Sequence, residues 1–116
     1  MNKSTDAFRV GQQAVGADGQ FAHPQLLDHS ERLKETFYKV GEHAWCLVGN
    51  GLSNQTFVEG PEGIIAIDTG ECHEEMKQAI DWLRKETDVP IVACIYTHFH
   101  YVAGTTAIIE ERGDDD

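Results

Sequence analysis

Short apolar runs separated by turn residues dominate the middle of the chain. Residues 44–48 and 54–58 are rich in β-branched and aromatic side chains, which are typical of strands. The turn cluster of residues 59–63 then predicts a hairpin into residues 64–68. Because this third run is apolar throughout, we expect a central strand that is covered on both faces. Residues 91–96 have the same character and predict a further buried strand.

Helical spacing of apolar residues occurs in three other segments. Pro24 suits a helix start, and the pattern after it predicts a helix over residues 25–37. Residues 73–85 predict a second helix with one face on the sheet, and residues 105–111 a short third one. Residues 1–22 are polar and aperiodic, so we expect a loosely held arm there. The order helix, three strands, helix, strand, helix predicts a mixed α/β layer.

The predicted sheet is too apolar for the few helices available to cover it. Strands that are buried on both faces need a covering layer on each side, and residues 23–116 supply few such layers. We therefore expect only a partial domain in residues 23–116. A second polypeptide or a missing C-terminal portion would complete it. We also expect the chain to be part of an oligomer and to associate when isolated, because one face of its sheet is uncovered.

Composition and charge exclude several classes of partner. The chain is 41% hydrophobic and 25% charged, which is ordinary for a globular domain, but its formal net charge is −11. This charge argues against nucleic acid and anionic membrane surfaces as partners. Three cysteines without a CxxC pair argue against a disulfide framework and favour a reducing compartment. Without an apolar run of about 20 residues or a visible signal peptide, the expected location is cytoplasmic.

Two histidines follow the last predicted strand, in the stretch Tyr96-Thr97-His98-Phe99-His100. Where the backbone leaves the strand, His98 and His100 can point toward one side. Neutral imidazoles that converge in this way are ligands for Zn²⁺. Ordinary loop histidines are the alternative interpretation. The sequence offers candidate metal ligands here, and no residue is assigned a catalytic role of its own.

Asp68 is the second candidate for this site. It ends the predicted strand over residues 64–68 and should emerge at the same edge of the sheet as His98. Its carboxylate can orient a metal-bound imidazole by accepting the second N–H of the ring, or hold the loop through backbone N–H groups. A cap for the following turn explains Asp68 equally well.

These features together resemble the metallo-β-lactamase superfamily. An apolar strand ends in Asp68-Thr69-Gly70, an amphipathic helix follows, and the histidine stretch comes next. The similarity is closer to one branch, the alkylsulfatases, and covers residues 23–112. It is carried by His23-Pro24-Gln25-Leu26, His29-Ser30, Val48-Gly49-Asn50-Gly51-Leu52-Ser53-Asn54, Val58-Glu59-Gly60-Pro61-Glu62-Gly63, Ile67-Asp68-Thr69-Gly70-Glu71 and Ile95-Tyr96-Thr97-His98.

The resemblance implies an αββα sandwich with zinc at the edges of its sheets. This chain would form the N-terminal half of that sandwich, a mixed sheet with flanking helices. The implied activity is hydrolysis of a small-molecule sulfate ester, or a related ester, by a metal-activated water. By position, His98 and His100 would be ligands of the first zinc. The ion would lower the pKa of a bound water towards neutrality and stabilise developing negative charge.

The sequence departs from the family's motif directly after His100. The motif continues His-x-His-x-Asp-His, and its last two positions are Val102 and Ala103 here. Neither side chain binds a cation, so the second zinc loses two ligands. Tyr101 can substitute as a hydrogen-bond donor or a phenolate ligand, or it simply packs. Because two histidines cannot close a tetrahedral site, we expect about one zinc ion, completed by ligands outside this chain.

Two hypotheses of function follow from these observations. In the first, the chain is part of a zinc-dependent hydrolase that resembles alkylsulfatases and has an altered second metal site. In the second, it is a degenerate, non-catalytic subunit with a structural or binding role. Zinc content separates the two, because only the first requires an ion held by His98 and His100.

Overall fold

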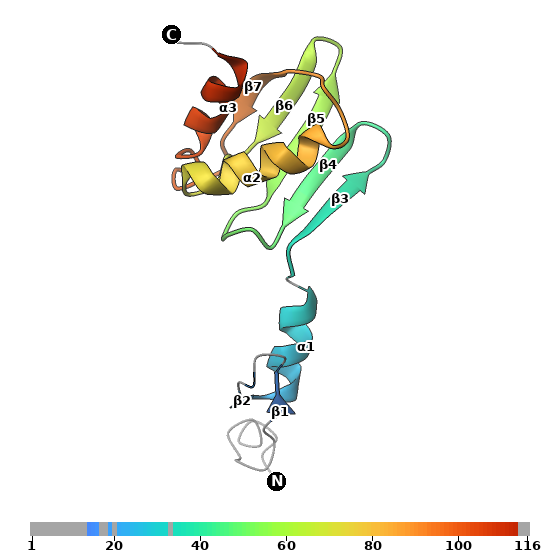
Figure 1. Cartoon of the computed structure of the whole chain (residues 1–116), viewed down its shortest axis with the longest axis vertical. Coiled ribbons are helices and arrows are strands. Elements are labelled where there is room, and N and C mark those ends of the chain that lie inside the picture. The colour runs from blue at the N-terminus through green and yellow to red at the C-terminus, as the bar shows by residue number, and fades with distance from the viewer. Residues whose placement is uncertain (1–13, 17–18, 20, 33, 114–116) are drawn as a thin grey trace. The chain divides into compact units, whose positions relative to one another are not determined.

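The computed structural model describes residues 14–16, 19, 21–32 and 34–113 of the 116-residue chain (Figure 1). The chain divides into two compact units, Met1–Lys34 and Glu35–Asp116. Much of the predicted arm over residues 1–22 lies outside the described residues, and its boundary stays a prediction.

The described residues of the first unit form a short strand pair and one helix. β1 (Ala14–Val15) pairs antiparallel with β2 (Phe21–Ala22), and α1 (Pro24–Arg32) follows. The ring of His23 caps the helix start, because its Nδ1 accepts a hydrogen bond from the backbone N–H of Gln25 at 3.1 Å. The helix therefore begins at Pro24, as the sequence predicts.

This helix is shorter than the sequence predicts. α1 ends at Arg32, and residues Thr36–Val40 form strand β3, in which Phe37 lies opposite Leu47. The prediction of a helix through Phe37 is therefore wrong. The spacing of Phe37 fits a helix, but a β-branched and aromatic segment favours a strand when a partner strand is available. Its ring stacks on Trp82 with a centroid distance of 5.9 Å, which fixes this segment against the second unit's own core.

The second unit is built on one five-stranded sheet. Its strands lie in the order β3-β4-β5-β6-β7, with antiparallel pairing from β3 to β6 and parallel pairing between β6 and β7. The bounds of the four later strands are Ala44–Val48, Gln55–Gly60, Gly63–Ile67 and Ile91–Ile95. The prediction of a mixed α/β layer is confirmed, with β3 as an additional strand.

Two helices cover one face of this sheet, as Figure 1 shows. α2 (His73–Arg84) connects β6 to β7 and gives the crossover that parallel strands require, and α3 (Thr105–Arg112) follows β7. Their inward side chains complete a single core with β4 to β7. That core consists of Trp45, Leu47, Phe57, Ile64, Ala66, Met76, Ala79, Ile80, Leu83, Ile91, Ala107 and Ile108. In the described ranges, no helix combines the length and the apolar character needed to cross a membrane.

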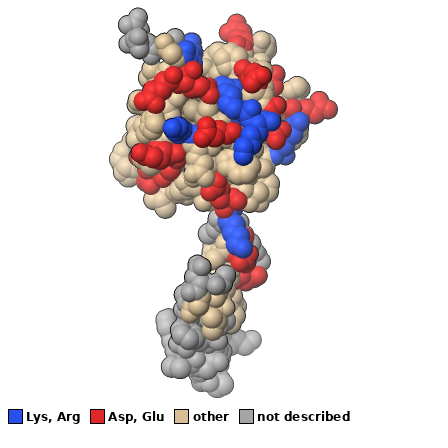
Figure 2. Space-filling view, viewed as in Figure 1, with Lys and Arg blue, Asp and Glu red and all other residues tan. Residues whose placement is uncertain are grey.

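Ion pairs join the outer sides of the two helices. Arg84 of α2 donates from Nε and Nη2 to the Glu111 carboxylate of α3, at 2.8 and 2.6 Å. These hydrogen bonds raise the pKa of Arg84 above its ordinary value. Nε2 of His73 on α2 also lies within hydrogen-bond distance, 2.6 Å, of a carboxylate oxygen of Glu110 on α3. Figure 2 shows acidic and basic side chains interspersed over this helix-covered side.

The opposite face of the sheet is not covered by the described elements of this unit. β6 is an inner strand, as predicted, but Ile65 and Ile67 are only half-buried on this face. β7 is an edge strand, and Val92 and Ile95 are 43% and 50% exposed. The cover that the sequence predicts for this face of the two strands is therefore not supplied by the described residues. Apolar composition alone does not tell whether the covering layer comes from the same segment.

Candidate functional site

The candidate site lies where β6 and β7 end side by side. Because the two strands are parallel, their carboxyl ends meet at one edge of the sheet, so Asp68 comes next to Thr97. Asp68 Oδ1 accepts from the backbone N–H of Thr97 at 2.7 Å, and Oδ2 from its hydroxyl at 2.5 Å. The Asp68 N–H donates to the carbonyl of Ile95 at 2.8 Å. Asp68, which is only 7% exposed, thus fixes the residue before His98 through its carboxylate.

Asp68 adopts a backbone conformation that few residues tolerate. Its φ is +62°, and it is the only described residue other than glycine with a positive φ. Asp and Asn adopt this left-handed region at lower cost than most residues. The turn that follows β6 therefore aims the Asp68 side chain at β7.

A second anchor holds the far side of the histidine loop. Thr69 is completely buried, and both its N–H and its hydroxyl donate to the carbonyl of Tyr101, at 2.9 and 3.1 Å. The Tyr101 N–H in turn donates to the carbonyl of His98 at 3.0 Å. Tyr101 therefore holds the turn through its backbone. Its half-buried ring lies with its centroid 5.1 Å from that of His98.

Gly104 lets the loop close onto β6. A Cβ at this position would overlap the carbonyl oxygen of Thr69 and would lie 2.5 Å from the Cβ of Met76. The φ of Gly104 is −78°, which any residue adopts, so the requirement here is space. Close backbone approach at Gly104 thus sets the distance between the histidine loop and the residues after β6.

A group of neighbouring hydroxyls extends from Thr69 toward α3. Thr105 Oγ1 donates to the carbonyl of Val102 at 2.8 Å, and the hydroxyls of Thr69 and Thr105 lie 3.2 Å apart. The Tyr96 hydroxyl lies 2.6 Å from the same Thr105 oxygen. Because Thr105 uses its one hydroxyl proton on Val102, Tyr96 is the donor in that pair. The end of β7 and the start of α3 are therefore joined through one side chain.

The two histidine rings lie beyond these anchors and are exposed to solvent. The ring centroids of His98 and His100 are 4.7 Å apart, and Phe99 stacks on His98 at 4.6 Å. His98 Nδ1 accepts a long hydrogen bond of 3.3 Å from the His100 N–H. A cation bound at His98 would displace this bond or move the ring proton to Nδ1, and the weak contact makes either change inexpensive.

The described residues supply only part of a metal-ligand set. They contain no cluster of three or more His, Cys, Asp or Glu side chains that could hold a metal ion. Val102 and Ala103, at the two positions after Tyr101, are exposed and carry no donor atoms. Two imidazoles can hold two positions of a tetrahedral zinc and leave two to be filled from elsewhere.

The structure brings the four candidate residues of the sequence together around one loop. Asp68 and Tyr101 support the loop, whereas His98 and His100 stand at its exposed end. Sequence reasoning did not identify Thr69 and Gly104 as parts of this site. Thr69 follows Asp68 directly, and Gly104 is the only glycine between residues 71 and 112, which is the one signal that the sequence offers.

The sequence is similar to those of known alkylsulfatases. A linear primary-alkylsulfatase from a Pseudomonas species is 38% identical over 93 residues, which cover 77% of this chain and 14% of that protein. A second linear primary-alkylsulfatase from Pseudomonas is 41% identical over 57 residues, covering 47% of this chain and 11% of that protein. No protein-family model matches the chain.

Solved structures show the same fold. The stereoselective inverting sec-alkylsulfatase Pisa1 from Pseudomonas superposes on 96% of this chain with a TM-score of 0.69 and 21% identity. A metallo-β-lactamase from Hirschia baltica matches 68% of the chain with a TM-score of 0.54 and 22% identity. The chain has part of the metallo-β-lactamase fold and resembles the alkylsulfatases. It covers 22% of the Pisa1 chain and 40% of the Hirschia protein.

Proposed function

We propose that this alkylsulfatase-like chain is part of a zinc-dependent hydrolase that cleaves a sulfate ester or a related ester. Similarity to two linear primary-alkylsulfatases supports the reaction class. The observation that carries the proposal is the placement of His98 and His100 at the end of β7, on a loop that Asp68 fixes through Thr97. Imidazoles on a loop that is fixed at its base, at the edge of a sheet, are suited to metal binding.

In this proposal His98 and His100 are ligands of one zinc ion. Exposed, adjacent imidazoles fit the donor preference of zinc, and only a weak hydrogen bond opposes their rearrangement. Asp68 holds the loop in register, and Tyr101 packs against His98. When bound, zinc would supply a water of lowered pKa and a positive charge for the leaving oxygen. The other ligands, and the pocket for a small-molecule ester, would come from further polypeptide.

The second metal position is altered in this proposal. Val102 and Ala103 stand where the family's motif has Asp and His, and their side chains have no donor atoms. The completed enzyme would therefore work with one zinc, or with a second site built from other residues. A reducing, cytoplasmic location fits the free thiols of Cys46, Cys72 and Cys94 and is part of the same proposal.

The same departure supports a second candidate function. A chain that has lost two ligands and retains an intact loop can persist as a non-catalytic structural or binding subunit. In that case the Asp68 anchor would maintain the fold, and His98 and His100 would carry no ion.

Metal content decides between these functions. We expect the assembly purified from its native source to contain about one zinc per chain by elemental analysis, because one tetrahedral site uses both histidines. His98→Ala and His100→Ala should each remove the ion. His43→Ala is the matched control, since His43 is an exposed turn residue distant in sequence from the loop. Equal zinc in wild type and both loop variants, or none in any, would contradict the proposal.

A gain-of-ligand variant then tests the second position. Val102→Asp combined with Ala103→His restores both donor types of the family's motif at exposed positions. We expect the double variant in the complete assembly to bind one more zinc than wild type. Unchanged stoichiometry would mean that the loop geometry differs as well as its residues.

A further inference from the structure

Three connections meet at the edge of the sheet where the histidine loop lies. β4 and β6 are both antiparallel to β5 and so run in the same direction, and β7 is parallel to β6. The carboxyl ends of these three strands therefore lie at one edge. Residues 49–54 follow β4, residues 68–72 follow β6, and the histidine loop follows β7. We call residues 49–54, which include Gly49 and Gly51, the glycine loop, and residues 68–72 the central turn.

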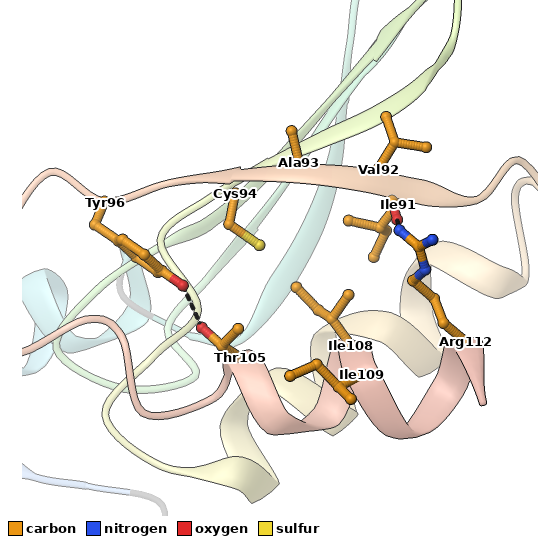
Figure 3. Close-up of a pocket in the computed structure, with 9 residues that line it drawn as sticks. All are labelled: Ile91, Val92, Ala93, Cys94, Tyr96, Thr105, Ile108, Ile109 and Arg112. Carbon is orange, nitrogen blue, oxygen red and sulfur yellow. Dashed lines mark hydrogen bonds between the residues drawn. The ribbon is translucent and has the colours of Figure 1, made fainter. Parts of the chain in front are cut away.

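The histidine loop depends on the central turn for its position. Asp68 of this turn accepts two hydrogen bonds from Thr97, and Thr69 donates two to a backbone carbonyl of the same loop. Where the loop returns to α3, the hydroxyls of Tyr96 and Thr105 lie 2.6 Å apart, and Figure 3 shows this bond between the end of β7 and the start of α3. A shift of the central turn would therefore move the base of the histidine loop.

The carboxylate of Glu75, in the first turn of α2, holds the other side of the central turn. One of its oxygens accepts a hydrogen bond from the backbone N–H of Glu71 at 2.9 Å. A Cβ at Gly70 would lie 2.7 Å from the same oxygen. A Cβ at Gly51 would lie 2.6 Å from the carboxyl carbon and 2.7 Å from both oxygens. The carboxylate thus lies between the central turn and the glycine loop and contacts both.

The two glycines leave the space that this carboxylate occupies. Real Cβ atoms do not approach other atoms as closely as 2.7 Å. The φ angles of Gly70 and Gly51 are +77° and +153°, which residues with a side chain rarely adopt. Space and backbone conformation therefore both require glycine at these positions, and Glu75 fills the volume that two side chains would take.

A buried amide attaches the glycine loop to the same turn of α2. Gln55 is completely buried, and its Nε2 donates to the carbonyl and the hydroxyl of Ser53, both at 3.1 Å. Asn50 Nδ2 donates to the backbone carbonyl of Glu75 at 2.8 Å and, more weakly, to Gln55 Oε1 at 3.4 Å. Both polar atoms of the Gln55 amide therefore have partners, and buried networks that are satisfied in this way favour one arrangement.

We propose that Glu75 is a positioning residue for the edge that carries His98 and His100. Its carboxylate keeps the glycine loop and the central turn in one arrangement, and the central turn in turn holds the histidine loop through Asp68 and Thr69. This role deepens the proposed function and rests on it for the metal, whereas the coupling between the three connections needs no ion.

The test is hydrogen exchange of single backbone amides in the full 116-residue chain, followed by NMR with EDTA present. Glu75→Ala removes the acceptor of the Glu71 N–H, so we expect this amide to exchange about tenfold faster. The amides of Thr69 and Thr97, which bind across the central turn and the histidine loop, should exchange at least about threefold faster. Glu75→Gln keeps an oxygen acceptor of the same reach and should restore all three rates.

Glu74→Ala is the matched control. Glu74 is an exposed carboxylate in the same first turn of α2, so its removal changes the interaction with the helix dipole equally. We expect wild-type exchange at the three reporter amides, and circular dichroism checks that each variant is folded. Faster exchange at Glu71 alone in Glu75→Ala would contradict the coupling to the histidine loop. An equal effect of Glu74→Ala, or no rescue by Glu75→Gln, would contradict a specific role of the Glu75 carboxylate.

Zinc titration of the same variants without EDTA separates this role from the proposed function. We expect the dissociation constant of zinc to rise at least about threefold in Glu75→Ala and to stay unchanged in Glu75→Gln and Glu74→Ala. Unchanged zinc affinity in Glu75→Ala would overturn the positioning of the metal ligands. A wild-type chain that binds no zinc would contradict the proposed function and the metal part of this inference, and the exchange rates in EDTA would still decide the coupling.

Discussion

The histidine loop has two regions of opposite character. Its base consists of Asp68, Thr69, Thr97 and Gly104, which make short hydrogen bonds or close backbone contacts. Asp68, Thr69 and Gly104 are buried, whereas Thr97 is exposed and held by Asp68. Its tip consists of His98, Phe99 and His100, which are exposed and contact mainly one another. Phe99 is 74% exposed, the largest value for an aromatic side chain among the described residues.

The base of the loop determines where the loop lies, and the tip carries the side chains that can bind a cation. The base fixes where the loop leaves β7 and where it returns to α3, so it fixes the location of the imidazoles. The tip contains the groups that can bind a cation, but its ring orientations depend on one long hydrogen bond and on contacts between the rings. Base substitutions should therefore change stability, and tip substitutions should change metal binding alone.

The most severe test of the base is Gly104→Ala. The added Cβ would overlap the Thr69 carbonyl, which belongs to backbone that cannot move independently of β6. We expect a loss of about 3 kcal/mol in the free energy of unfolding, the upper end for an overpacked site. Urea denaturation followed by the fluorescence of Trp45 and Trp82 measures it.

Gly60→Ala is the control for the glycine change itself. Gly60 also has an ordinary φ, but a Cβ there would meet the Gly63 carbonyl at 3.5 Å, which is normal contact. A small effect at Gly60 with a large one at Gly104 would confirm that close approach is the cause. Equal stability of the two variants would show that the loop is not pressed against β6.

Much of this base could be predicted from the sequence, but its closest contact could not. Asp68 and His98 each follow an apolar strand, and parallel strands bring their carboxyl ends together, so their proximity was predictable. The contact of Thr69 with Gly104 joins residues 35 positions apart and depends on the exact packing of a turn. The local pattern of apolar and polar residues does not predict a contact between residues so far apart in the sequence.

The error in the fold has a similar cause. Phe37 fits helical spacing, and only its pairing with Leu47 on β4 makes it part of a strand. Ile65 and Val92 lie on apolar strands, and the sequence of such strands does not tell which polypeptide covers them. Periodicity within a segment identified α2 and strands β4 to β7. Which residues pack against a given segment could be read only from the three-dimensional structure.

A smaller loss of stability is expected when the carboxylate of the base is removed. Asp68→Ala deletes the acceptor for both the N–H and the hydroxyl of Thr97, and it places alanine at a φ of +62°. We expect a loss of about 2 kcal/mol in the free energy of unfolding, because a buried turn loses its partner. The same urea denaturation measures this loss.

Asp68→Asn separates the two causes. Asparagine tolerates the left-handed conformation and keeps an acceptor for one of the two Thr97 donors, so its loss should be about half as large. Asp81→Ala, at an exposed position of α2, serves as a control for loss of a negative charge. If Asp68→Ala were as stable as Asp81→Ala, the base would not depend on this carboxylate.

The smallest change in stability is expected for substitutions at the tip of the loop. His98→Ala and His100→Ala remove exposed rings that contact one another and the rings of Phe99 and Tyr101, and that share one hydrogen bond of 3.3 Å. We expect each to change the free energy of unfolding by no more than about 0.5 kcal/mol in the absence of metal. Zinc should then stabilise wild type more than either variant, because only a folded loop with both imidazoles brings the two ligands together. A metal-free loss as large as that of Asp68→Ala would mean that the tip supports the base, and the division between position and chemistry would fail.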